Sequence, residues 1–421
     1  MRIEIICTGD EVLTGKITNT NFSYMAQKLE DVGLSVHWGT TVGDDRESLL
    51  AAFHLAGTRA DAVIVNGGLG PTVDDLSQEI AAQAAGVDLV LHEEWLATME
   101  EFFTRRARTM PPNNVKQAML PSTAEMIDNP IGTACGFAID IGKARFFFTP
   151  GVPRELRRML EEQVIPRILA RSGAPASIHL KRFHSYCIGE SHADEMLKGV
   201  EDLDPEGGVK LGFRAHYPQL ETKLTVRGTD MNDVHRKLAP VAAAVRQRLG
   251  NFIMAEDDQT LEGVTLAALI SQQATLSVVE SFTAGQIAAR IAHLPNAETV
   301  FRRGVVVRDF TDLAPVYATP PLDGEMDQAK IEAVARAARD QTGATHSLAV
   351  LIELDHGADR MDFGGTIWIG IASPDGVEFR RSRILGGREW VRLGAVELGL
   401  DCLRRKLQGL PVTERIDFER T

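Results

Sequence analysis

The sequence predicts an α/β protein built from three parts. Strand-like and helix-like segments alternate through residues 1–170 and again through residues 256–421, and the buried strands are continuous apolar runs such as Asp61–Asn66. Such alternation is typical of parallel sheets with helices on both faces. In residues 171–255, glycines and prolines separate short strands instead. We therefore predict an N-terminal parallel-sheet domain, a small α+β linking domain and a C-terminal α/β domain with these boundaries.

The individual elements follow from apolar periodicity and from glycine or proline stops. The expected strands are 3–7, 34–42, 61–66, 146–149, 210–215, 221–226, 276–279, 305–307, 346–351 and 366–372. The expected helices are 21–31, 46–56, 75–85, 93–106, 154–169, 233–249, 286–292, 326–340 and 389–407. A polar linker is expected at 257–259.

Composition restricts the ligands that the chain can bind. Its 421 residues exceed one ordinary core, and 44% apolar with 24% charged residues is typical of a globular protein. The net charge of −13 argues against nucleic acid as a partner, because nucleic-acid binding needs basic surface. A phosphorylated ligand would have to be held locally, by backbone amides, a helix N-terminus or a metal ion.

The cysteines and the apolar runs indicate a cytoplasmic protein. The four cysteines are far apart in sequence and form no CxxC pair, which is typical of a reducing compartment. Glu4 and Asp10 interrupt the apolar start where a signal peptide would need an unbroken run. No run approaches the roughly 18 apolar residues that cross a bilayer, so no membrane partner is expected.

A glycine-rich turn in the segment DAVIVNGGLGPTVDDL, residues 61–76, gives the strongest local signal. A buried strand leads directly into Gly67, Gly68 and Gly70, and a helix follows. Glycines let the backbone approach a phosphate, and the helix N-terminus adds partial positive charge. The same glycines are equally compatible with a plain tight turn.

Acidic side chains follow three of the strands at the same sheet edge: Asp10, Glu11, Asp44, Asp74 and Asp75. Carboxylates beside a phosphate would repel it, and a divalent cation such as Mg, Mn or Co would relieve that conflict. The chemistry expected of such a site is phosphoanhydride hydrolysis by a metal-activated water. Taken singly, each acid more commonly represents a solvated loop residue.

Five motifs in order resemble those of the competence/damage-inducible protein A (CinA) family: TGDEVLTGKITNTN, VGDD, NGGLGPTVDD, NPIGTACGF and FTPGVPREL. The resemblance implies a MoaB/MogA-like (molybdopterin-binding) fold for the N-terminal domain. It also implies a divalent-metal-dependent ADP-ribose pyrophosphatase, a small linking domain and a homodimer.

The resemblance assigns roles position by position. Catalysis would fall to Asp44, Asp74 and Asp75, and metal binding to Asp10, Glu11 and Asp75. The nucleotide and its phosphates would contact Thr8, Gly9, Asn66, Gly67, Gly68, Gly70, Thr72, Thr133, Gly136, Pro150 and Gly151.

The C-terminal domain departs from the family pattern at three places. The family motif Glu-Ser-Cys-Thr-Gly-Gly belongs to a nicotinamide mononucleotide amidohydrolase with a serine nucleophile, and here Ser281 and Thr283 remain while Phe282 and Ala284 differ. The family's tyrosine and lysine positions align with Arg308 to Phe310 and with Leu313, and its glycine-rich loop aligns with 352–357. Because a serine needs an activating partner, we hypothesise that Ser281 and Thr283 are relics of an inactive deamidase.

Three functions therefore remain open. The favoured prediction is a cytoplasmic, metal-dependent ADP-ribose pyrophosphatase that acts on a small-molecule nucleotide. The alternatives are a non-catalytic pterin- or nucleotide-binding protein and a nicotinamide mononucleotide amidohydrolase acting through Ser281.

Overall fold

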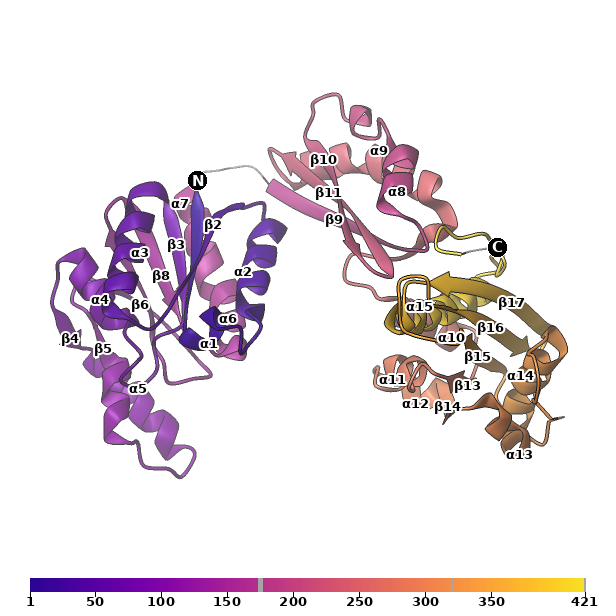
Figure 1. The fold of residues 1–421 in the computed structure, drawn as a ribbon. Helices are drawn as coiled ribbons and strands as arrows, with labels where there is room; N and C mark the ends of the chain where they lie inside the picture. Colours follow the sequence, from indigo (N-terminus) through magenta and orange to yellow (C-terminus); the bar gives the residue numbers. More distant parts are fainter. Residues whose placement is uncertain (173–176, 320, 420–421) are drawn as a thin grey trace. The chain divides into compact units, whose positions relative to one another are not determined.

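The computed structural model describes residues 1–172, 177–319 and 321–419. Internal contacts divide the chain into two compact units, Met1–His179 and Leu180–Thr421, and each is described by itself (Figure 1). Within the described residues, no helix has the length and apolar character needed to cross a membrane.

The first unit contains a mixed sheet with strand order β2-β1-β3-β8-β7-β6. These strands are β1 (Ile3–Thr8), β2 (Val36–Val42), β3 (Ala62–Asn66), β6 (Glu125–Ile127), β7 (Gly136–Ile141) and β8 (Ala144–Thr149). Strands β2, β1, β3 and β8 run parallel, whereas β7 and β6 are antiparallel to their neighbours. The sheet is therefore mixed, whereas the sequence predicted a parallel sheet. The difference arises because a short turn joins β7 directly to β8. A separate antiparallel pair joins β4 (Leu89–Leu91) to β5 (Met119–Pro121).

Helices cover both faces of this sheet, as expected for a three-layer α/β domain. One apolar layer contains Ile3, Ile5 and residues of α2 (Thr20–Asp31), α6 (Pro153–Met159) and α7 (Ile165–Ser172). The opposite layer contains Ile6 and residues of α3 (Arg46–Arg59), α4 (Ser77–Ala85) and α5 (Glu93–Thr104). Alternate residues of β1 thus point to opposite helical layers. The short helix α1 (Asp10–Leu13) follows β1, and a 3₁₀ segment (Pro112–Ala118) precedes β5.

The second unit begins with a sheet of order β10-β11-β9-β12, packed on α8 (Glu190–Leu197) and α9 (Met231–Leu249). Its strands are β9 (Ser177–Tyr186), β10 (Val209–His216), β11 (Gln219–Gly228) and β12 (Ile253–Glu256). One face of this sheet meets both helices in a single apolar core.

The remainder of the second unit is a mixed sheet of order β14-β13-β15-β16-β17. The strands are β13 (Leu276–Ser281), β14 (Phe301–Val307), β15 (His346–Leu354), β16 (Gly364–Ser373) and β17 (Gly376–Leu385). Strands β14, β13 and β15 are parallel, and β16 and β17 continue antiparallel. One face packs on α10 (Leu261–Ser271), α11 (Gln286–Ala292) and α15 (Arg388–Leu407), and the other on α13 (Leu313–Tyr317) and α14 (Gln328–Thr342).

Candidate functional site

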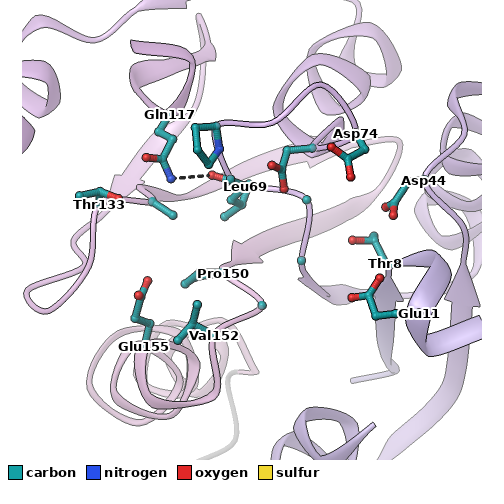
Figure 2. A pocket seen from close by; sticks show the side chains of 18 residues that line it. Thr8, Glu11, Asp44, Leu69, Asp74, Gln117, Thr133, Pro150, Val152 and Glu155 are labelled. Atoms are coloured by element: carbon teal, nitrogen blue, oxygen red, sulfur yellow. Dashed lines mark hydrogen bonds between the residues drawn. The ribbon is translucent and has the colours of Figure 1, made fainter. Parts of the chain in front are cut away.

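A cavity of about 450 Å³ lies at the carboxyl ends of β1, β3 and β8 and of the neighbouring β2 (Figure 2). Open α/β sheets bind their ligands at this edge. The predicted residues that line the cavity are Thr8, Gly9, Glu11, Asp44, Gly67, Gly68, Gly70, Asp74, Asp75, Thr133, Pro150 and Gly151. The structure therefore brings together the ends of strands that are far apart in the sequence.

The glycine turn forms one wall of the cavity. Gly67 has φ +113°, and a Cβ there would lie 2.5 Å from Thr8 Oγ1. In the described chain, the N–H groups of Gly68, Leu69 and Gly70 have no hydrogen-bond acceptor. Thr8 is 7% exposed, and its Oγ1 also lacks a partner among the described residues. These free polar groups can receive the oxygens of an anionic ligand.

Acidic groups gather at one end of the cavity. Figure 2 shows Glu11, Asp44 and Asp74 around Thr8, while Glu155 lies at the opposite end beside Thr133. Partial burial raises the pKa of Asp44, and the carboxylates of Asp10, Glu11 and Asp74 add to the rise, while a hydrogen bond from the Asp10 backbone opposes it. The described lining contains no lysine or arginine. An anionic ligand would therefore meet repulsion at the acidic end.

The acids do not assemble as a metal centre. Asp75 Oδ2 already accepts hydrogen bonds from Thr72 N at 2.9 Å and Thr72 Oγ1 at 2.5 Å. Asp10 Oδ1 accepts from Asp44 N at 3.2 Å, and Asp44 Oδ2 accepts from Asp10 N at 3.2 Å. Among the described residues, no group of three or more His, Cys, Asp or Glu is placed to hold a metal ion. In this arrangement the acids do not form a set of ligands for the predicted divalent ion. The ion itself stays a prediction.

Four predicted site residues lie outside the cavity lining: Asp10, Asn66, Thr72 and Gly136. Asn66 Nδ2 donates to Pro150 O at 2.7 Å, and Asn66 Oδ1 accepts from Asn21 at 2.9 Å, so this amide connects β3 to β8. A Cβ at Gly136 would lie 3.0 Å from Phe148 O, which explains the glycine by packing. The helix expected from residue 75 begins at Ser77, so Asp74 and Asp75 belong to the preceding turn.

The lining also includes residues to which no catalytic, metal or phosphate-binding role was assigned: Leu69, Pro71, Gln117, Ala134, Val152 and Glu155. Gln117 Nε2 donates to Leu69 O at 3.2 Å and thereby supports the glycine turn from a distant segment (Figure 2). Val152 and Glu155 lie in the quoted FTPGVPREL motif, so that motif contained a signal for them. Gln117 had no such signal.

The second candidate site surrounds Ser281, the last residue of β13. Ser281 is 1% exposed, and its Oγ accepts a hydrogen bond from Ile352 N at 3.0 Å. The turn that follows has positive φ at Phe282 (65°), Ala284 (57°) and Gly285 (79°). Two non-glycine residues in this conformation store strain, a feature that often accompanies functional turns.

The groups around this turn differ from the family pattern in charge. The Arg308 guanidinium carbon lies 5.3 Å from the centre of the Phe282 ring. Leu313, at the family's lysine position, has an apolar side chain that is fully buried in the core, so no ammonium group is present there. The loop after β15 is held by Asp355, whose carboxylate accepts from Arg383 at 2.9 and 2.8 Å.

Comparison with known proteins accounts for all three parts of the chain. Residues 4–170 match the family described as "Probable molybdopterin binding domain", 181–255 match "Damage-inducible protein CinA KH domain", and 258–407 match "CinA C-terminal domain". A CinA-like protein of Shewanella sediminis is 38% identical over 416 residues, which is 97% of this chain and 96% of that protein. The chain belongs to the CinA-like protein family.

Two further CinA-family relatives add detail. A Shewanella oneidensis protein named nicotinamide-nucleotide amidohydrolase PncC is 36% identical over 414 residues, covering 97% of this chain and 96% of its own length. A crystal structure of CinA from Thermoplasma acidophilum is 32% identical and covers 39% of this chain and 96% of that one, with a TM-score of 0.37. The predicted MoaB/MogA-like fold of the N-terminal domain and the family membership are confirmed.

The favoured functional prediction for this CinA-like chain is wrong. The relative from Shewanella oneidensis is named for hydrolysis of a nicotinamide nucleotide, and none of the relatives described here is named for cleavage of ADP-ribose. The name of this relative also contradicts the prediction that a pyrophosphatase domain at the N-terminus is joined to an inactive C-terminal domain. That prediction rested on the family resemblance and on the glycine turn and clustered acids of the N-terminal domain, while the absent tyrosine, lysine and glycine-rich loop argued against activity at Ser281.

Proposed function

We propose that this chain is an amidohydrolase that converts the carboxamide of a nicotinamide nucleotide to a carboxylate, with Ser281 as nucleophile. The observation that carries the proposal is the retention of Ser281 and Thr283 in the motif at the end of β13, in a chain 36% identical to a protein named for this reaction. A serine at the carboxyl end of a parallel strand lies where α/β folds bind ligands.

The proposed chemistry divides the hydrolysis into two steps. Ser281 Oγ attacks the carboxamide carbon, ammonia leaves, and an ester links the acyl group to the serine. Water then cleaves the ester and releases the carboxylate, so one water is consumed for each ammonia released. The Ile352 N–H that donates to Oγ at 3.0 Å would stabilise negative charge on that oxygen.

Two consequences follow from the surroundings of Ser281. Because Ser281 is 1% exposed, the turn after it or the loop after β15 has to move when substrate enters. Arg308 stands in the family's tyrosine position, and a guanidinium stays protonated, so Arg308 acts by charge and does not accept the serine proton.

The experiment incubates the purified full chain with nicotinamide mononucleotide and measures ammonia and nicotinic acid mononucleotide. Turnover that disappears in Ser281→Ala and persists in Ser277→Ala supports the proposal. Ser277 is a suitable control because it lies on the same strand and is also 1% exposed. Absence of acid product from the unsubstituted chain, or full turnover by Ser281→Ala, contradicts it.

We also propose that the N-terminal cavity binds a phosphorylated pterin or nucleotide without cleaving it. The unpartnered Thr8 hydroxyl and the free amides of the glycine turn favour this second function. Titration calorimetry with ADP tests it in the absence of metal. Heat that saturates at one site and is lost in Gly68→Ala supports the proposal, and no heat up to millimolar ADP contradicts it.

A further inference from the structure

Glu280 is a buried carboxylate beside Ser281 with an unusual set of partners. It is 0% exposed and lies on the interior strand β13, opposite Val306 of β14 and Val350 of β15. Its Oε2 accepts from Thr283 Oγ1 at 2.5 Å and from Ile287 N at 3.2 Å, and its Oε1 accepts from Ala288 N at 3.0 Å. These donors are neutral, and together they compensate for part of the desolvation of a buried charge.

The three donors lie within and directly after one strained turn. Thr283 is inside the turn, and Ile287 and Ala288 are in the first turn of α11. Phe282 and Ala284, on either side of Thr283, adopt left-handed backbone angles that cost on the order of 1–2 kcal/mol each in non-glycine residues. Such a conformation persists only where surrounding contacts hold it, and Glu280 supplies three of them.

The far end of α11 is fixed independently. Arg290 Nη1 lies 2.5 Å from Glu397 Oε2, and its Nη2 lies 2.5 Å from Glu262 Oε2. Glu397 is 3% exposed and also accepts from Gln219 of β11. Because these pairs anchor α11 to α15 and α10, loss of the Glu280 contacts would loosen the turn while the helix stays in place.

The geometry points to Glu280 as the positioning residue that holds the Ser281–Gly285 turn in the conformation required for attack by Ser281. This inference rests on the proposed amidohydrolase function. The hydrogen bonds of Glu280 within the described residues go to Thr283, Ile287 and Ala288, so it acts on Ser281 through the turn. Correct placement of a nucleophile within about 1 Å affects the rate of the chemical step more than ground-state binding.

The test compares Glu280→Gln with Asp204→Asn in the full chain. Glu280→Gln keeps the size of the side chain but replaces one acceptor oxygen by an NH2 group. That donor would face an N–H donor of α11, so the hydrogen bond is lost. Asp204 of the linking domain is a matched control, because its carboxylate is also buried, at 4% exposed, and also accepts from neutral donors, Gly208 N at 2.6 Å and Val209 N at 3.1 Å.

We expect Glu280→Gln to accelerate amide hydrogen exchange at Ile287 and Ala288 by about tenfold or more, and to lower kcat by about tenfold with KM within about twofold. Asp204→Asn should leave both readouts near those of the unsubstituted chain. Unchanged exchange in Glu280→Gln, an effect on KM alone, or an equal loss of kcat in both variants overturns the inference. If the unsubstituted chain shows no turnover, the proposed function fails, whereas the exchange rates still decide whether Glu280 holds the turn.

Discussion

The hydroxyl of Ser281 accepts the backbone N–H of Ile352 at 3.0 Å, and this bond joins β13 to β15 where their backbone pairing ends. The register between these strands runs from Leu276 opposite His346 to Glu280 opposite Val350. The serine side chain thus satisfies the N–H of a residue two positions beyond Val350, the last residue of β15 paired with β13. The proposed nucleophile therefore also has a structural role.

Replacing Ser281 by alanine should destabilise the fold as well as abolish turnover. The buried Ile352 N–H loses its acceptor, which costs about 1–3 kcal/mol in the free energy of unfolding. Urea denaturation of Ser281→Ala and Ser277→Ala measures this cost. Ser277 Oγ lies 2.6 Å from Thr342 Oγ1, which also bonds to Ala338 O at 2.7 Å, so the control leaves no orphaned group. Equal stability losses in the two variants would contradict the assignment.

Gly68 and Gly86 provide a matched pair for testing the glycine turn. Both have φ +68°, so alanine strains both backbones equally, by about 1 kcal/mol. Only at Gly68 does a Cβ meet the Ser77 side chain, with Ser77 Cβ at 3.2 Å, whereas nothing lies within 4 Å at Gly86. Gly68→Ala should therefore lose about 1–3 kcal/mol more in the free energy of unfolding than Gly86→Ala. Equal losses in urea denaturation would show that the turn tolerates a side chain.

The location of the N-terminal cavity was predictable because strand ends in a parallel sheet share an edge. The sequence marked Thr8, Asp44 and the Gly67–Gly70 turn as ends of such strands, and all of them line the cavity. The antiparallel strand β7 was not predicted. No helix separates residues 136–141 from β8, so the strand–helix alternation that marked the other strands is absent there. Periodicity alone carries no signal for that pairing.

Side-chain contacts between distant segments were beyond sequence reasoning. Asn66 was predicted to touch the ligand, yet its amide bonds to Pro150 and Asn21 decide its orientation. Glu280 was read only as part of a motif, because its three donors become neighbours only when the turn folds back onto β13. The functional consequence of a motif residue thus depends on partners that spacing does not reveal.

Asp44→Asn should stabilise the protein at neutral pH. Burial and three neighbouring carboxylates raise the pKa of Asp44 in the folded state, so the folded chain holds this proton more tightly than the unfolded chain. The ionised group therefore destabilises the fold above its folded pKa, and the penalty disappears as pH falls below the unfolded value. We expect a gain of about 0.5 kcal/mol at pH 7 that vanishes near pH 3. Thermal unfolding across this range checks it, and a gain that is constant with pH would contradict the electrostatic cause.

Asp401→Asn should be among the most destabilising single-atom changes in the second unit. Asp401 Oδ1 accepts from Arg404 at 2.8 and 2.6 Å, and Oδ2 accepts from Arg405 at 2.7 Å. Arg404 is 2% exposed and Arg405 0%. Loss of the Asp401 carboxylate, which both arginines share, therefore removes a stabilising negative charge from beside two buried positive charges. Breaking a buried pair of this kind costs about 3–5 kcal/mol in the free energy of unfolding.

The control for this prediction is Glu389→Gln on the same helix, α15. Glu389 also bonds to an arginine, Arg392, but its side chain is 63% exposed, so its loss should cost no more than about 1 kcal/mol. Both arginines of the buried cluster also donate to Asn251 O, at 3.0 and 3.1 Å, which connects α15 to the segment that follows α9. Asp401→Asn should therefore lower the urea midpoints of the linking and C-terminal domains together. A midpoint within the range of Glu389→Gln would show that the arginines find other acceptors when the carboxylate is removed.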